Sequence, residues 1–189
     1  MKKVLMTIVA VAMATTMNAQ WYVGGSVGFA SVKVGGGNSE TLYKILPEVG
    51  YALNKQWSVG VTFGYQKGDH VAGTSFNQVV KQNAFGGINV AEAFTLSPYA
   101  RYTFINGKLV NVFCDAGLEF ASIKDGGTLF GFGARPGIAI KATDKLSFVT
   151  HVGFVGFNSF SPKGGGDSSS EFGVDLTTLN LLFGLYYNF

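Results

Sequence analysis

The chain has 189 residues, of which 27 are glycine, and only 13% are charged, with a formal net charge of +3. Glycine at this frequency disfavours helices, because each interior glycine costs on the order of 1 kcal/mol relative to alanine. The few charges form no basic patch of the kind that binds nucleic acid. The single cysteine, Cys114, excludes an internal disulfide and has no metal-type spacing to other residues.

The first 19 residues have the pattern of a cleavable signal peptide. Lys2 and Lys3 precede an apolar run from Val4 to Ala14, and small residues follow as far as Ala19. The apolar run is well short of the roughly 20 residues that a spanning helix needs, which disfavours the alternative of an N-terminal anchor. No cysteine follows the run, so a lipoprotein is disfavoured too. We expect 1–19 to be removed and 20–189 to form one domain.

Apolar and polar residues alternate along most of that domain. A period of two places the two sets on opposite faces of a strand. The pattern is cleanest in 57–66, and it ends the chain, where alternate residues from Leu179 to Phe189 are apolar or aromatic. The alternation predicts eight strands, near 21–29, 43–53, 57–66, 94–104, 110–120, 130–141, 146–157 and 179–189.

The connections between these strands alternate in length. Short turns are expected at 54–56, 106–108 and 143–145, and longer connections near 33–41, 67–92, 121–129 and 158–171. Short turns at one end and longer loops at the other are typical of an outer-membrane barrel. The predicted fold is therefore all-β: an eight-stranded antiparallel up-and-down transmembrane β-barrel in the cell outer membrane. An even strand count puts both termini in the periplasm.

Charged residues of the strands lie on the face opposite to the aromatic residues. A soluble barrel of the lipocalin kind would have its apolar residues inside, whereas a charge facing lipid costs roughly 2–4 kcal/mol at the midplane. We therefore expect a charge network inside the barrel, perhaps joined by His151, made by Lys44, Glu48, Arg101, Asp115, Glu119, Arg135 and Lys141.

This network has two interpretations. Eight strands leave an interior about wide enough for side chains alone, and buried charges persist only when paired, so a filled lumen is the favoured one. The alternative is a narrow pore that opens when the pairs exchange partners.

Three prolines, Pro47, Pro98 and Pro136, each lie within three residues of an inward charge and remove a ladder donor. We expect a β-bulge at each of them.

Aromatic residues gather at the strand ends, as in the two interfacial belts of a membrane barrel. The belt at the short-turn end comprises Trp21, Tyr51, Trp57, Tyr102, Phe104, Phe148, Tyr187 and Phe189. The belt at the loop end comprises Phe29, Tyr43, Phe63, Tyr65, Phe94, Phe120, Phe130 and Phe154. The alternative, that aromatics are merely good strand formers, does not explain their position at the ends.

The C-terminal residues Leu185, Tyr187 and Phe189 resemble the signal by which outer-membrane proteins are recognised for assembly. Several strings resemble a known family: Leu46 to Tyr51, Ser97 to Tyr102, Ala134 to Ile138 and Thr178 to Asn180. They are similar to segments of the small porin-like outer-membrane β-barrels of Bacteroidetes, which are broadly similar to the OmpX and OmpA barrels. The resemblance implies a fold and a compartment, and no single activity.

No catalytic, cofactor or metal site is expected. The histidines are His70 and His151, and Ser147 lies more than about 10 Å along the strand from His151. A lipid-modifying enzyme is therefore the third hypothesis, after a structural role and a pore. Expected partners are outer-membrane lipid, the barrel-assembly machinery and an extracellular partner at loops 67–92 and 158–171; nucleic acid is not expected.

Overall fold

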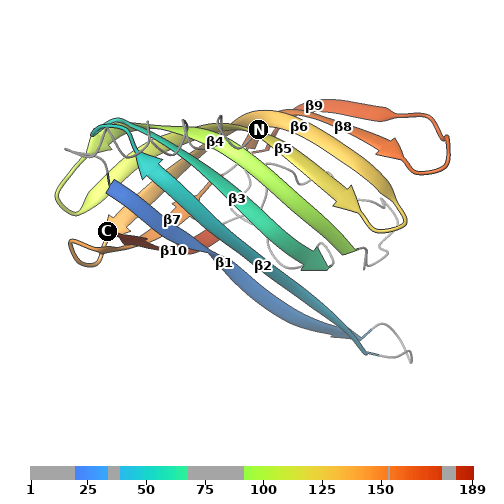
Figure 1. Ribbon diagram of the computed structural model, residues 1–189, viewed down its shortest axis with the longest axis horizontal. Coiled ribbons are helices and arrows are strands. Elements are labelled where there is room, and N and C mark those ends of the chain that lie inside the picture. Colours follow the sequence, from blue (N-terminus) through green and yellow to red (C-terminus); the bar gives the residue numbers. More distant parts are fainter. Residues whose placement is uncertain (1–19, 34–38, 68–91, 153, 176–181) are drawn as a thin grey trace, which may run out of the picture.

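Strands form the regular structure of the part of the chain that the structure describes. The computed structural model describes residues 20–33, 39–67, 92–152, 154–175 and 182–189. None of these residues belongs to a helix that could cross a membrane. The strands (Figure 1) are β1 (Gln20–Lys33), β2 (Ser39–Ala52), β3 (Trp57–Lys67), β4 (Glu92–Asn106), β5 (Val110–Ile123), β6 (Gly127–Lys141), β7 (Leu146–His151), β8 (Phe154–Pro162), β9 (Ser169–Asp175) and β10 (Leu182–Asn188).

These strands close into an eight-stranded antiparallel barrel, as the alternation predicts. Strands β1 to β6 pair in chain order, and β7 and β8 pair in succession with β6, so together they fill the seventh position. Strands β9 and β10 fill the eighth, pairing with β8 and β7. Tyr22 to Gly25 of β1 pair with Asn188 to Leu185 of β10, which closes the barrel.

The short turns lie where they were predicted, and side-chain caps explain them. Asn54 Oδ1 accepts the backbone N–H groups of Gln56 and Trp57, each at 2.8 Å. Thr143 Oγ1 accepts those of Lys145 and Leu146 in the same way, at 3.2 and 3.0 Å. Such Asx and ST turns fix the chain reversal locally. The C-terminus lies at this end of the barrel (Figure 1).

Two of the predicted long connections are wrong. The prediction at 121–129 fails because β5 and β6 continue to a three-residue turn, in which Asp125 has φ 57°. Most of 158–171 is also a hairpin, with only 163–168 between β8 and β9. Serine and glycine in these segments favour a loop by composition, but the ladders continue through them. The structure describes only the ends of the connection at 67–92, which are strand residues; 68–91 lie outside the described residues.

Of the three proline bulges, the structure contains one. Pro47 and Pro98 each pair in register with one neighbouring strand. On the other neighbouring strand the pairs at the proline are missing, but the register is the same before and after the gap. At Pro136 the register shifts by one residue between the pairs Gly137–His151 and Ala134–Val155, because β6 has two residues in that interval and its neighbour has three. A second register shift lies between Thr103 and Ile105, without a proline. A missing N–H is therefore compatible with regular register.

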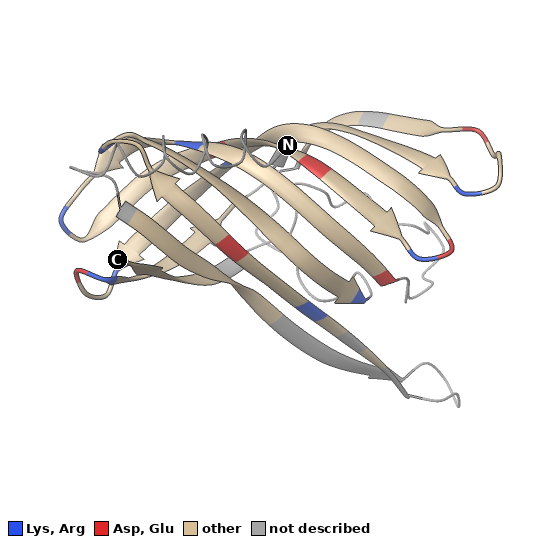
Figure 2. Ribbon diagram, in the orientation of Figure 1, with Lys and Arg blue, Asp and Glu red and all other residues tan. Residues whose placement is uncertain are grey.

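The outer face of the barrel is apolar between two charged ends. On β6 the outward positions run from Phe130 to Ile140, a length of about 33 Å along the strand and roughly 25 Å along the axis at a tilt of about 40°. This height matches the apolar band of outer-membrane barrels. Figure 2 shows Lys, Arg, Asp and Glu at the two ends and at a few positions along the strands.

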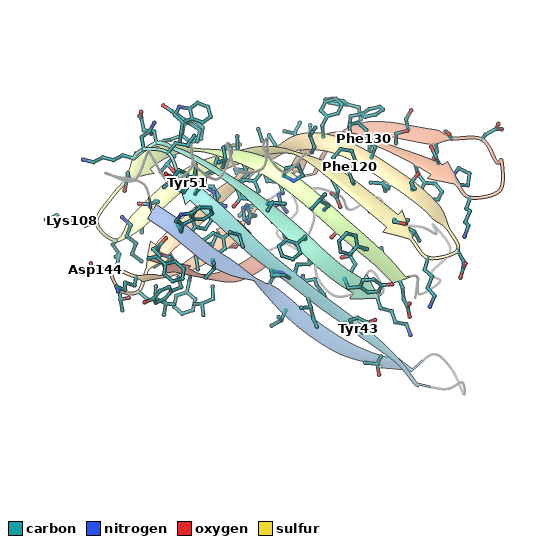
Figure 3. All side chains as sticks on the ribbon, in the orientation of Figure 1. Tyr43, Tyr51, Lys108, Phe120, Phe130 and Asp144 are labelled. Carbon is teal, nitrogen blue, oxygen red and sulfur yellow. The ribbon has the colours of Figure 1, made fainter. Side chains whose placement is uncertain are left out.

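Aromatic residues border this band at both ends, as predicted. At the turn end the rings of Trp21 and Tyr51 pack with their centroids 5.0 Å apart, and those of Trp57 and Tyr102 with their centroids 4.9 Å apart. Tyr43 and Tyr51 mark opposite ends of β2, and Phe120 and Phe130 lie together near the loop end (Figure 3), with ring centroids 5.3 Å apart. The side chains of Phe29 and Phe154 lie outside the described set.

Candidate functional site

The centre of the barrel interior is a buried ion pair. Arg101 on β4 lies directly across the ladder from Asp115 on β5. Its guanidinium donates from Nε to Asp115 Oδ1 at 2.6 Å and from Nη2 to Oδ2 at 2.8 Å. This two-pronged geometry is the strongest available to an arginine and a carboxylate. Arg101 Cζ also lies 3.9 Å from the ring centroid of Phe113, a cation–π contact.

A second acid lies on the far side of Arg101. Glu48 Oε1 accepts hydrogen bonds from the hydroxyl groups of Tyr99 and, at 2.7 Å, Tyr186. Tyr22 and Tyr99 share a hydrogen bond of 2.7 Å between their hydroxyl groups. Glu48 Oε1 is 3.8 Å from Arg101 Nη2, a longer ion pair than that with Asp115. The guanidinium thus lies between two carboxylates and is bonded mainly to one.

His151 completes the contacts of Asp115. Its Nε2 lies 2.8 Å from Asp115 Oδ2, and its ring packs edge-on against Phe113 with centroids 5.4 Å apart. One carboxylate therefore holds both an arginine and a histidine. We name the residues joined by these contacts the central cluster: Tyr22, Glu48, Tyr99, Arg101, Phe113, Asp115, His151 and Tyr186.

Glycines allow the aromatic members of the cluster to lie across the ladder. Each inward aromatic side chain is paired in register with a glycine whose Cβ, if present, would lie within 2.5 Å of that side chain. These pairs are Tyr22–Gly50, Tyr99–Gly60, Tyr186–Gly24 and Phe113–Gly137. Only the smallest residue leaves room for so close an approach. The rings therefore fill the lumen from the wall inwards.

The structure places the seven predicted charged residues in two locations. Six are buried inside the barrel, with three bases and three acids in balance: Lys44, Arg101 and Arg135 with Glu48, Asp115 and Glu119. Lys141 is different, because it is half-buried at the turn end, where Nζ donates to Gly107 O at 2.9 Å and Asn106 Oδ1 at 3.3 Å. It belongs to a turn and not to the central cluster.

A small cavity of about 30 Å³ adjoins the cluster. Its polar lining includes Glu48, Thr62, Arg135, His151 and Tyr186. A cavity of this size holds about two water molecules. Among the described residues no group of three or more His, Cys, Asp or Glu is placed to hold a metal ion; His70 lies outside them.

Sequence reasoning missed the three tyrosines of the central cluster. Tyr22, Tyr99 and Tyr186 occupy the polar parity of their strands, and each faces an inward glycine across the ladder. Parity was a usable signal, because an aromatic residue on that face cannot meet lipid. The partner of each hydroxyl depends on register between distant strands, and alternation alone does not supply it.

The predicted assembly residues lie on the outer face of the last strand. Leu185, Tyr187 and Phe189 are all exposed there, and the rings of Tyr187 and Phe189 are 5.1 Å apart. The backbone N–H of Phe189 donates to Trp21 O at 2.9 Å, so the chain end is fixed beside the first strand.

Comparison with known proteins assigns the family. The outer membrane protein beta-barrel domain family matches residues 4–189. Among solved structures, the N-terminal β-barrel domain of Pseudomonas aeruginosa OprF is 11% identical, with 91% of this chain and 98% of that chain covered and a TM-score of 0.43. Ail, the attachment invasion locus protein of Yersinia pestis, is 12% identical, with 92% of this chain and 100% of that chain covered and a TM-score of 0.43.

Neisserial surface protein A is 15% identical, with 90% of this chain and 91% of that chain covered and a TM-score of 0.41. No curated protein sequence matches. The family match extends over nearly the whole sequence, including the strands that close the barrel and carry the central cluster. The chain belongs to the outer membrane protein beta-barrel domain family.

Proposed function

We propose that this outer-membrane barrel is a closed structural protein that acts through its loop end. Its lumen is sealed by the central cluster, and its hairpins and loops present surfaces to extracellular partners. In this proposal the chain is exported by a signal peptide cleaved before Gln20, and both termini lie in the periplasm. N-terminal sequencing of the mature protein would contradict the export step if it started at Met1.

The observation that supports closure is the bonding across the lumen. Members of the central cluster come from β1, β2, β4, β5, β7 and β10, on all sides of the barrel. Arg101 and both carboxylates are buried, and the adjoining cavity holds about two waters. In this proposal the layer blocks a hydrated ion unless a buried charge pair separates, and separation leaves an uncompensated charge.

Planar-bilayer recording of the refolded protein, after heat-modifiable gel migration has verified folding, tests this proposal. We expect no discrete openings from the wild-type protein. Glu48→Gln should also stay silent, because the tyrosine hydroxyls still hold the side chain. Asp144→Asn, at an exposed turn tip, is the matched control for a charge change outside the lumen. Reproducible wild-type openings would refute the closed barrel.

A narrow pore is the second candidate, and one observation favours it. Arg101 is bonded to Asp115 but lies only 3.8 Å from Glu48, so a small rotation exchanges its partner without leaving it unpaired. A pore gated by this exchange predicts openings whose conductance or frequency shifts in Glu48→Gln and does not shift in Asp144→Asn. This pattern separates a gate from a leak at the lipid boundary.

Surface contact through the loop end needs a separate test. The tip of the β8–β9 hairpin is exposed throughout 163–168 and carries three consecutive glycines. An epitope tag placed there should be detected on intact cells if this end is extracellular. Loss of binding to a host or envelope partner, with folding retained, would support the partner role of this hairpin; tag detection only after outer-membrane permeabilisation would reverse the proposed orientation.

A further inference from the structure

At the loop end of the wall, β1 and β9 are each paired on one side only among the described residues. β1 pairs with β10 from Tyr22 to Gly25, and from Ser26 to Lys33 it pairs with β2 alone. β9 pairs with β8 alone. Figure 1 shows the two strands diverging here, β1 with β2 in one direction and β9 with β8 in another. Within the described part of the chain, each strand therefore has one edge that joins no ladder.

Side-chain exposure marks the same two strands as margins of the wall. Val27 of β1 is 81% exposed, whereas Val23 of the same strand, which has a paired strand on each side, is 38% exposed. Phe172 of β9 is 72% exposed, whereas Phe132, in the same row on β6, is 47% exposed. An outward side chain is covered mainly by the strands beside it, so Val27 and Phe172 each lack cover on one flank.

Glycine is required where the ladder between β1 and β10 ends. Gly25 has φ 143°, a conformation that residues with a side chain rarely adopt. A Cβ at this position would also lie 2.4 Å from Leu46 O of β2. The point at which β1 leaves β10 and stays with β2 is thus determined by the sequence.

Both edges lie near the level of the apolar band. Phe172 pairs with Phe157, and Phe157 pairs with Phe132, one of the outward residues of β6 in that band. On the other margin, Val27 pairs with Ile45, which is also outward and exposed. Hydrocarbon offers no water to backbone N–H and C=O groups, so an open sheet edge does not persist against lipid. A further strand is needed to cover each edge.

We propose that a second copy of this chain covers both edges, with β1 of each copy pairing antiparallel with β9 of the other. β1 runs from the turn end to the loop end, and β9 runs the opposite way. A two-fold axis along the membrane normal keeps both copies in one orientation and brings each β1 edge to the β9 edge of the other copy. The directions are those of an antiparallel ladder. Both edges of both copies are then paired, so the assembly closes at two copies.

Length and face determine the register of this ladder. β9 has seven residues, and the part of β1 beyond Gly25 is one residue longer. The outward residues of the two strands must share a face. One register meets this condition and pairs all of β9, and it places Val27 opposite Val174 of the second copy. The ladder is about 23 Å long, and on β1 it continues directly from the ladder with β10 that ends at Gly25.

The position of the edges favours a second copy over a soluble polypeptide. A covering strand lies in hydrocarbon itself, so it needs apolar residues at its outward positions and a free edge at the same height. A second barrel in the same membrane has both, with Val27 on one strand and Phe172 and Val174 on the other. A soluble strand has its own polar groups to desolvate at this depth.

Cysteine cross-linking in outer membranes tests this ladder. Two forms of the full-length chain, both with Cys114→Ser, are produced together: one carries Val27→Cys and a first tag, the other Val174→Cys and a second tag. Cysteines opposite one another in an antiparallel ladder are close enough for a disulfide. On mild oxidation we expect a disulfide-linked product with both tags. The matched control, Leu96→Cys with Phe130→Cys, has outward cysteines on β4 and β6 and should give about tenfold less product.

Several results would overturn the proposal. Product no greater than that of the control would mean that the two edges do not meet between copies. In one chain that carries both Val27→Cys and Val174→Cys, an internal disulfide in a monomer would show that each copy closes its own wall. Should a cysteine variant fail heat-modifiable migration, Ser31→Cys with Ser170→Cys decides, because the same register places these two residues opposite one another.

A photo-reactive phenylalanine analogue at Phe172 identifies the occupant independently. The proposal predicts a cross-linked product with twice the mass of the mature chain, composed of this chain alone. A product that contains a different protein, or a cross-link to lipid only, would refute the second copy as the covering strand.

Discussion

The central cluster and the β8–β9 hairpin are built from the same kind of strand and are stabilised in different ways. The cluster joins side chains from six strands, so each member has partners far away in sequence. In the hairpin, Phe157 pairs with Phe172 and Ser161 Oγ lies 3.2 Å from Ser168 Oγ, both local contacts. Beyond the hairpin, its β8 strand is paired with β6, and no cross-lumen bond is seen among its described residues. We therefore expect substitutions in the central cluster to lower the stability of the barrel more than substitutions in the hairpin.

Removing the arginine of the cluster should have the largest effect. Arg101→Ala leaves Asp115 and Glu48 buried without their shared cation, so we expect the free energy of unfolding to fall by about 3–5 kcal/mol. Denaturant titration in lipid vesicles measures it. In the double variant with Asp115→Asn the two losses should be less than additive, and full additivity would mean that the pair does not act as a unit.

Glycine substitutions compare the two regions directly. Gly50→Ala puts a Cβ within 2.5 Å of the Tyr22 ring, and the expected loss is about 1–3 kcal/mol. Gly173→Ala, in the hairpin, meets no atom within 4 Å, so its stability should be unchanged or higher by up to about 1 kcal/mol. The same denaturant titration serves for both. Equal effects of the two substitutions would contradict the division into a packed region and a tolerant one.

Lengthening the hairpin tip should cost still less. An epitope inserted between Gly164 and Gly165 roughly doubles the connection between β8 and β9, for which loop-closure entropy predicts about 0.6 kcal/mol. Heat-modifiable migration and the unfolding midpoint report the outcome. A loss comparable with that of Gly50→Ala would mean that the tip makes contacts on which the barrel depends.

The smallest expected effect concerns the exposed pair at the rim. The hydrogen bond and charge of Lys124 lower the pKa of Glu92 below its usual range. The pair thus stabilises the fold above the ordinary glutamate pKa, and this contribution disappears as the pH falls through the lowered value. Solvent screens both side chains, so we expect a shift visible by NMR titration and little change in stability. Lys124→Gln should return the Glu92 pKa towards its ordinary value; no change would contradict the pair.

Alternation predicted the eight-stranded barrel and the faces of its strands, because the period of two reflects geometry directly. It also put Arg101 and Asp115 inside, but it did not predict that Arg101 would bond to Asp115 more closely than to Glu48, since cross-strand register decides that. The expected loop at 121–129 failed because Ser122 and Thr128 read as loop residues although they continue the strands. Tyr99 and Tyr186 lie on the same polar face, but the expected network was limited to charged residues and therefore left them out.

The four ring–glycine pairs of the lumen should constrain how these positions change in evolution. A larger residue at Gly60 would meet the Tyr99 ring, and loss of that ring would leave a void beside the glycine. Because a change at either position alone is expected to lower stability, we expect the two residues of each pair to change together. Aligned relatives should therefore show correlated substitution at Gly60 and Tyr99, and at Gly24 and Tyr186, while the hairpin tip varies freely.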